Sequence, residues 1–160
     1  MARNYSINGT NATGATTTYI TAIELHGANI VRTWVFDITM GCASTAGDNP
    51  TTWALSRYTS AAAAVTPYTP LQLDPVNIAS AAIGGATATG VNSSSTEPGG
   101  MTLATSLLVI PLNQRATFRY VASPGAEFVN TFASGNGLSL RQLGAAAQAS
   151  VGTATLLFFE

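Results

Sequence analysis

The single cysteine and the single histidine are the first residues whose chemistry could be catalytic. Cys42 and His26 could formally form a pair in which the imidazole takes the proton of the thiol. Nothing in the sequence orients such a pair, so we expect Cys42 to be a small buried or turn residue and His26 to end a strand. One cysteine excludes an intrachain disulfide, and no Cys/His cluster offers the roughly four ligands of a zinc site.

Paired carboxylates could perform the acid–base chemistry of a glycosidase. The chain offers Glu24, Asp37, Asp74 and Glu127, but no spacing singles out two of them. The sequence also lacks a G-x-S-x-G nucleophile motif, a Walker phosphate loop and an EF-hand calcium loop. We therefore expect a protein that is not an enzyme, with no catalytic residue, no metal and no cofactor.

Arginine stands between or beside aromatic residues at two places, and such a pattern could stack nucleic-acid bases. The first is Phe118-Arg119-Tyr120 and the second is Arg57-Tyr58. Each holds a single cation, so core aromatics with an outward arginine explain both. The chain has no lysine and a net charge of −1, which leaves no basic field for a nucleic acid.

Charge is scarce along the whole chain of 160 residues. Charged residues make up 8% of it, where about 25% is typical, while hydrophobic residues make up 46%. A surface of hydroxyls, amides and small residues loses little desolvation free energy when it is pressed against a partner. We expect a protein that is packed against neighbours; the alternative is a free domain with neutral polar loops. No apolar run reaches the roughly 18 residues of a membrane span.

The chain consists mostly of short apolar runs separated by turn residues, and the secondary structure of these runs must position any binding site. Alternation with a period of two predicts strands over 16–25, 30–39, 53–59 and 116–121. Further strands are expected over 78–83, 101–112, 127–132, 138–142 and 150–159, with 101–112 as a central strand buried on both faces. Residues 67–75 contain three prolines and predict an edge or a connection, and 84–100 predict a loop. The pattern predicts an all-β sandwich, first a jelly roll and second an immunoglobulin-like fold.

The N-terminal segment is polar and predicts an extended arm over residues 1–15, followed by one sandwich domain over 16–160. Tyr5 and Ile7 are its large apolar side chains, and we expect them to anchor the arm on a partner. The segment has no apolar signal-peptide region, so we expect the chain to be made and assembled in the cytoplasm. The predicted core comprises Trp34, Phe36, Leu108, Ile110, Phe118, Tyr120, Leu138, Leu140, Leu157 and Phe159.

Four stretches of the sequence resemble small structural proteins of tailed bacteriophages. They are Leu112–Val129, Asn136–Arg141, Trp53–Thr59 and Thr69–Pro75. The resemblance implies a β-sandwich component of the virion, most specifically a capsid cement or decoration protein. It also implies the major capsid protein as partner, a homotrimer as the assembly, and no catalytic residues.

Two other function classes remain open at this point. One is a tail or receptor-binding module that recognises a host glycan through loops such as 84–100, and the other is an enzyme. A cement protein occurs on heads at lattice-like copy number, whereas a receptor-binding module occurs at the tail in few copies.

Overall fold

The computed structural model describes residues 3–11, 19–26, 32–43, 47–60, 66–80, 91–94, 101, 105–130, 136–144 and 151–160. This part of the chain contains strands and turns and no α-helix, hence none that could cross a membrane. The strands are β1 (Asn4–Thr10), β2 (Ile20–His26), β3 (Trp34–Cys42), β4 (Pro50–Tyr58), β5 (Thr66–Tyr68), β6 (Leu71–Gln72), β7 (Val91–Ser94), β8 (Ser106–Asn113), β9 (Phe118–Val121), β10 (Phe128–Val129), β11 (Gly137–Leu143) and β12 (Gly152–Phe159).

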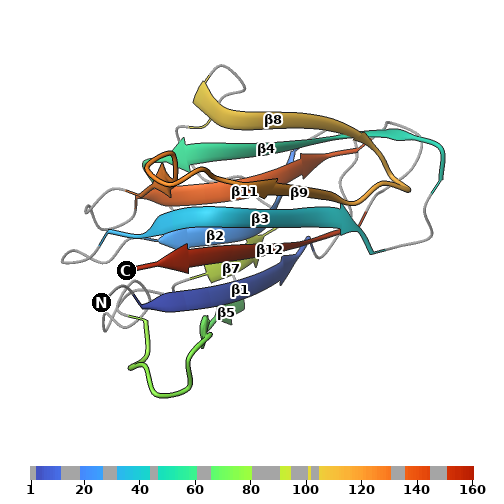
Figure 1. Cartoon of the computed structure of the whole chain (residues 1–160). Helices are drawn as coiled ribbons and strands as arrows, with labels where there is room; N and C mark the ends of the chain where they lie inside the picture. Colours follow the sequence, from blue (N-terminus) through green and yellow to red (C-terminus); the bar gives the residue numbers. More distant parts are fainter. Residues whose placement is uncertain are drawn as a thin grey trace.

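Two antiparallel sheets make up the molecule (Figure 1). The β3 sheet has the order β10-β3-β12-β1-β6, and β9 pairs with β3 on the same edge as β10. The β4 sheet has the order β5-β7-β2-β11-β4-β8. The chain changes sheet between consecutive strands everywhere except from β4 to β5, from β7 to β8 and from β9 to β10. The prediction of an all-β sandwich is confirmed.

The hydrophobic core lies between the two sheets, because alternate residues of each strand point inward. The β3 sheet contributes Tyr5, Ile7, Val35, Ile38, Met40, Ala154, Leu156 and Phe158. The β4 sheet contributes Ala22, Ile23, Leu25, Trp53, Leu55, Leu138 and Leu140. Leu138 and Leu140 were predicted in the core, and both are fully buried.

The N-terminal segment is not an extended arm over its described residues. Asn4–Thr10 form β1, which pairs along its full length with β12 and at its start with β6. The polar residues that suggested an arm occupy the outer face of this strand, while Tyr5, Ile7 and Gly9 face inward. The sandwich therefore begins at residue 4 and not at residue 16.

Two predicted core faces are reversed. Trp34, Phe36, Leu157 and Phe159 are only half-buried, and the buried face of β12 is Ala154, Leu156 and Phe158 instead. A bulge where β3 pairs with β12 shifts the register between Leu157 and Phe158. Because a one-residue shift moves side chains to the opposite face, alternation read through residues 34–38 assigns the wrong face to Trp34 and Phe36.

The apolar run 101–112 does not form a central strand. Its described strand, β8, ends the β4 sheet, and its side chains alternate between half-buried and exposed. Four residues that were predicted in the core pack against it without being fully buried: Leu108, Ile110, Phe118 and Tyr120.

Two further predicted segments differ from the structure. Residues 91–94 of the predicted loop 84–100 form β7, and residues 78–80 of the predicted strand 78–83 are not in a strand. The remainder of both segments lies outside the described residues.

A buried polar network closes one end of the sandwich. Asn11 Nδ2 donates to Gln142 Oε1 at 2.6 Å, and the Gly152 amide donates to Asn11 Oδ1 at 2.7 Å. Gln142 Nε2 donates to Thr51 Oγ1 at 2.9 Å, and that hydroxyl donates to the Leu143 carbonyl. These bonds join the ends of both sheets and satisfy amides that would be costly to bury alone.

Candidate protein-interaction site

A short loop on the edge of the β3 sheet carries four of the six exposed large hydrophobic side chains of the described chain. We define it as the apolar loop, residues Leu71–Ile78. It begins in β6, which pairs with β1 through Ser6 and Tyr5, and the Leu73 amide donates to the Asn4 carbonyl at 2.9 Å. The loop is thus attached to the sandwich through the strand that the sequence assigned to an arm.

Asp74 sets the turn at the tip of the apolar loop. Its Oδ1 accepts a hydrogen bond from the Val76 amide at 3.0 Å, and its carbonyl accepts one from the Asn77 amide at 3.0 Å. An aspartate that bonds the backbone two residues on, followed by a proline with fixed φ, is a strong turn combination. At the far end of the loop, Tyr5 Oη donates to the Ile78 carbonyl at 3.0 Å. The backbone of the loop is therefore fixed before any partner binds.

The apolar side chains of this loop point away from the sandwich. Their exposed fractions are 62% for Leu71, 51% for Leu73, 88% for Val76 and 63% for Ile78. Only Val109 and Val121 join them as exposed large hydrophobic residues in the described chain. Figure 1 shows the loop projecting below the two sheets. Concentration of apolar surface on one projecting element is typical of a site that binds another protein.

The energetic capacity of the apolar loop follows from the size of its side chains. Fully burying one Val, Leu or Ile contributes about 1.5–3 kcal/mol, so four partly exposed side chains offer roughly 4–8 kcal/mol. Asp74 is the one charged residue in Leu71–Ile78. Because the backbone is already ordered, little of this free energy is spent on fixing the loop during binding.

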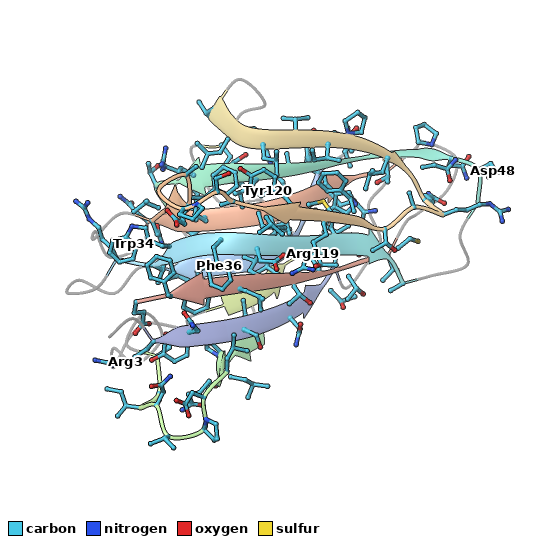
Figure 2. The ribbon with its side chains drawn as sticks, viewed as in Figure 1. Arg3, Trp34, Phe36, Asp48, Arg119 and Tyr120 are labelled. Atoms are coloured by element: carbon cyan, nitrogen blue, oxygen red, sulfur yellow. The ribbon has the colours of Figure 1, made fainter. Side chains whose placement is uncertain are left out.

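The outer face of the β3 sheet carries a row of aromatic rings near one end (Figure 2). Trp34 stacks on Phe159 with ring centroids 5.4 Å apart, and Phe36 lies 6.1 Å from Phe159. Beside them, Arg119 Nε donates to both carboxylate oxygens of Asp37 at 3.0 and 3.1 Å. This bond raises the pKa of the exposed Arg119 guanidinium, which stays charged at every relevant pH. The rings cover one another, so this face is less open than the apolar loop.

The β4 sheet buries a group of titratable side chains. His26 Nε2 lies 3.4 Å from Glu24 Oε2, and the ring of His26 meets that of Tyr58 edge-on at 5.5 Å. Burial, together with the nearby charge of Glu24, raises the pKa of the Tyr58 hydroxyl well above its usual value. A hydroxyl held protonated here is not a general base near neutral pH.

His26 and Cys42 do not meet. His26 is the last residue of β2 and pairs with Gly137 at the start of β11, whereas Cys42 ends β3 and pairs with Gly152. A side chain on Gly152 would touch Gln142, near the other end of β11, so the two residues lie at opposite ends of the sandwich. The expectations that His26 ends a strand and that the two form no catalytic pair agree with this geometry.

The four carboxylates singled out in the sequence are dispersed. Asp37 bonds Arg119, Asp74 bonds the loop backbone, Glu24 lies beside His26, and Glu127 accepts the Gly125 amide at 3.1 Å. Among the described residues, no group of three Asp, Glu, His or Cys side chains is arranged to hold a metal ion.

Tyr5 and Ile7, which the sequence suggested as partner anchors, are core residues. Both are almost completely buried, and Tyr5 stacks on Phe158 with ring centroids 5.4 Å apart. Their surface is already used within the chain, so the anchor assignment is wrong for this fold. The aromatic–arginine patterns behave as expected: Tyr58 is buried and Arg57 exposed, and Arg119 is exposed between two inward rings.

Comparison with protein families, curated proteins and solved structures finds no match to this chain. The site therefore has to be interpreted from its own geometry.

Sequence reasoning identified the stretch 67–75 as an edge or connection but missed its binding surface. A signal was present: Leu71, Leu73, Val76 and Ile78 lie within eight residues that hold Pro75 and neighbour Pro70. Proline excludes such a segment from central sheet positions, so its apolar side chains have few places to be buried.

Proposed function

We propose that this chain is a non-enzymatic structural protein of a virion, most specifically a capsid cement protein that binds the major capsid protein lattice. The observation that carries the proposal is the apolar loop, with a fixed backbone and four outward apolar side chains. Such a loop matches the need of a protein whose function is to remain attached to a neighbour.

The strand order supports the proposal at the level of the fold. The strands β1-β12-β3-β9 and β2-β11-β4-β8 alternate between the sheets in the way expected of a jelly roll with two Greek keys. We propose this classification for the framework, with β5, β6 and β7 as an insertion between β4 and β8. Jelly rolls are common in viral capsid proteins and in lectins.

The composition supports attachment at many sites. A lattice presents the same pocket repeatedly, so moderate affinity per apolar loop yields firm attachment once several contacts form together. A homotrimer, as the resemblance to phage structural proteins implies, would present three loops at once. The scarcity of charge keeps the desolvation cost of the surrounding surface low.

A tail or receptor-binding module is the competing proposal, since lectin domains share the jelly-roll architecture. Such a module would bind a glycan through an aromatic platform with polar side chains beside it. The row of Trp34, Phe36 and Phe159 is such a platform in kind, but its rings cover one another, whereas the apolar loop offers open aliphatic surface. The aliphatic character of the loop favours a protein partner.

Binding to capsids tests the proposal. Heads that lack this protein are incubated with purified wild-type chain, with Val76→Ser, or with Val121→Ser, and the bound fraction is measured by sedimentation. Val121 is a matched control because it is also an exposed valine, on β9 and outside the loop. Loss of one buried valine, about 1.5–3 kcal/mol, corresponds to weaker binding of the Val76 variant by about tenfold or more.

Two results would contradict the cement proposal. One is equal binding of all three proteins to heads, and the other is binding only to tails.

A further inference from the structure

Among the described strands, β8 pairs only with β4, and its other edge differs from the remaining edges of the two sheets. The opposite edge of the β4 sheet is β5, with three residues including Pro67, and the edges of the β3 sheet are β6, β9 and β10, with two to four residues each. A short edge strand is one of the usual means by which proteins prevent edge pairing. β8 has eight residues, Ser106–Asn113, none of them charged.

Solvent reaches the outer side of β8. Val109 is 40% exposed, and Pro111 and Asn113 are exposed as well. Figure 1 shows β8 as the outermost strand at the top of the β4 sheet. A long, uncharged, apolar edge strand of this kind is a template for pairing with another strand.

From this edge we infer that β8 pairs antiparallel with β8 of a second copy of this chain. Proline is tolerated in an edge strand where its nitrogen faces away from the neighbouring strand, so Pro111 indicates that Val109, two residues before it, also directs its backbone groups to the free edge. The pairing of β8 with β4 shifts register between Leu108 and Ser106, so this alternation ends before Leu107. Centred on Val109, the pair lets both Val109 residues exchange two backbone bonds.

The side chains near this edge also fit a second copy. The edge formed by β8, β9 and β10 is only partly covered, because the apolar side chains that pack against the core there are half-buried: Leu108, Ile110, Leu112, Phe118, Tyr120 and Phe128. The twofold axis of an antiparallel strand pair is perpendicular to the sheet, so the inward faces of both copies lie on the same side. The two partly covered edges then face each other, and apolar surface on each is covered by its equivalent.

The absence of charge in β8 favours a second copy over an unlike partner chosen by electrostatics. A twofold axis brings only the residues on the axis near their own equivalents, so a charge at the centre of the edge would repel itself. With Val109 on the axis, the two valines are neighbours across the interface.

Charge placed at position 109 tests this pairing in purified protein. Val109→Lys and Val109→Glu each place like charges on the axis, whereas Val109→Thr retains a β-branched neutral side chain as the matched control. A twofold contact at β8 joins two copies of the assembly that the other contacts form, so it doubles the mass of that assembly. The Lys and Glu variants should therefore sediment at about half the wild-type mass, and Val109→Thr at the wild-type mass.

An equimolar mixture of the Lys and Glu variants should recover the wild-type mass, because opposite charges then meet on the axis. Recovery distinguishes pairing at β8 from simple loss of folding. Hydrogen exchange of the wild-type chain is the second measurement: the Val109 amide should become protected as protein concentration rises. Unchanged mass in both charged variants, or concentration-independent exchange at this amide, would overturn the inference. Neither outcome depends on capsid binding.

Discussion

Removal of the N-terminal strand should unfold the protein. The sequence predicts an arm over residues 1–15, so deletion of residues 2–14 would leave melting unchanged, but Asn4–Thr10 form β1 between β12 and β6. Truncation deletes the buried side chains of Tyr5 and Ile7, for which the usual costs are about 3–5 and 2–5 kcal/mol. The sum is comparable to the whole stability of a typical domain, about 5–15 kcal/mol.

Circular dichroism during thermal melting measures this effect. Deletion of residues 2–14 should abolish the cooperative transition, and Tyr5→Ala should lower the melting temperature strongly. Asn4→Ala is the control, since the Asn4 side chain is exposed and its carbonyl bond to Leu73 is retained. A truncated protein that melts at the wild-type temperature would refute the placement of β1 in the sheet.

Two further predictions concern the buried residues of the β4 sheet. Burial and the charge of Glu24 raise the pKa of the Tyr58 hydroxyl in the folded chain, whereas in the unfolded chain this hydroxyl ionises at about pH 10. The folded state is therefore fully stabilised below pH 10 and loses stability as the pH rises above 10. Tyr58→Phe should reduce this alkaline loss in urea titrations at pH 8–11 and leave neutral stability unchanged or higher; a neutral loss above about 1 kcal/mol would contradict it. Gly137→Ala should destabilise by about 1–3 kcal/mol in the same titrations, since the added Cβ would strike the Tyr58 hydroxyl and lie 2.5 Å from the Leu25 carbonyl. Gly41→Ala, whose Cβ would have no neighbour nearer than 3.2 Å, should cost less, and equal costs would refute the steric argument.

The fold class was predictable because alternation and turn residues act locally. The turn at Asn113–Ala116 and the turn at Ser123–Ala126 are both present, each closed by a backbone bond of 2.9 Å. The side of the sheet that each run faces was less predictable. The bulge in β3 depends on its pairing with β12, more than a hundred residues away in sequence, so local alternation alone misassigned Trp34 and Phe36.

The two misread segments have a common physical cause. The polar strand β1 and the apolar edge strand β8 both contradict the expectation that apolar segments lie in the middle of a sheet and polar segments lie outside it. β1 pairs along its full length with β12 and buries Tyr5 and Ile7, whereas β8 is at an edge despite four large aliphatic residues in a row. Position in a sheet depends on long-range pairing, which the composition of one segment does not encode.

The candidate site was predictable only in outline. Prolines placed residues 67–75 outside the central sheet, but the outward direction of Val76 and Ile78 depends on bonds from Asp74 and Tyr5. Tyr5 and Ile78 are 73 residues apart in the sequence, so the hydrogen bond between them could be found only from the folded structure.

Electron cryo-microscopy of purified virus particles that contain this protein tests the central proposal most directly. The account predicts density for the sandwich at lattice-like copy number on the head, with the apolar loop Leu71–Ile78 buried against the major capsid protein. Density confined to the tail, or a head-bound sandwich whose apolar loop faces solvent, would contradict it.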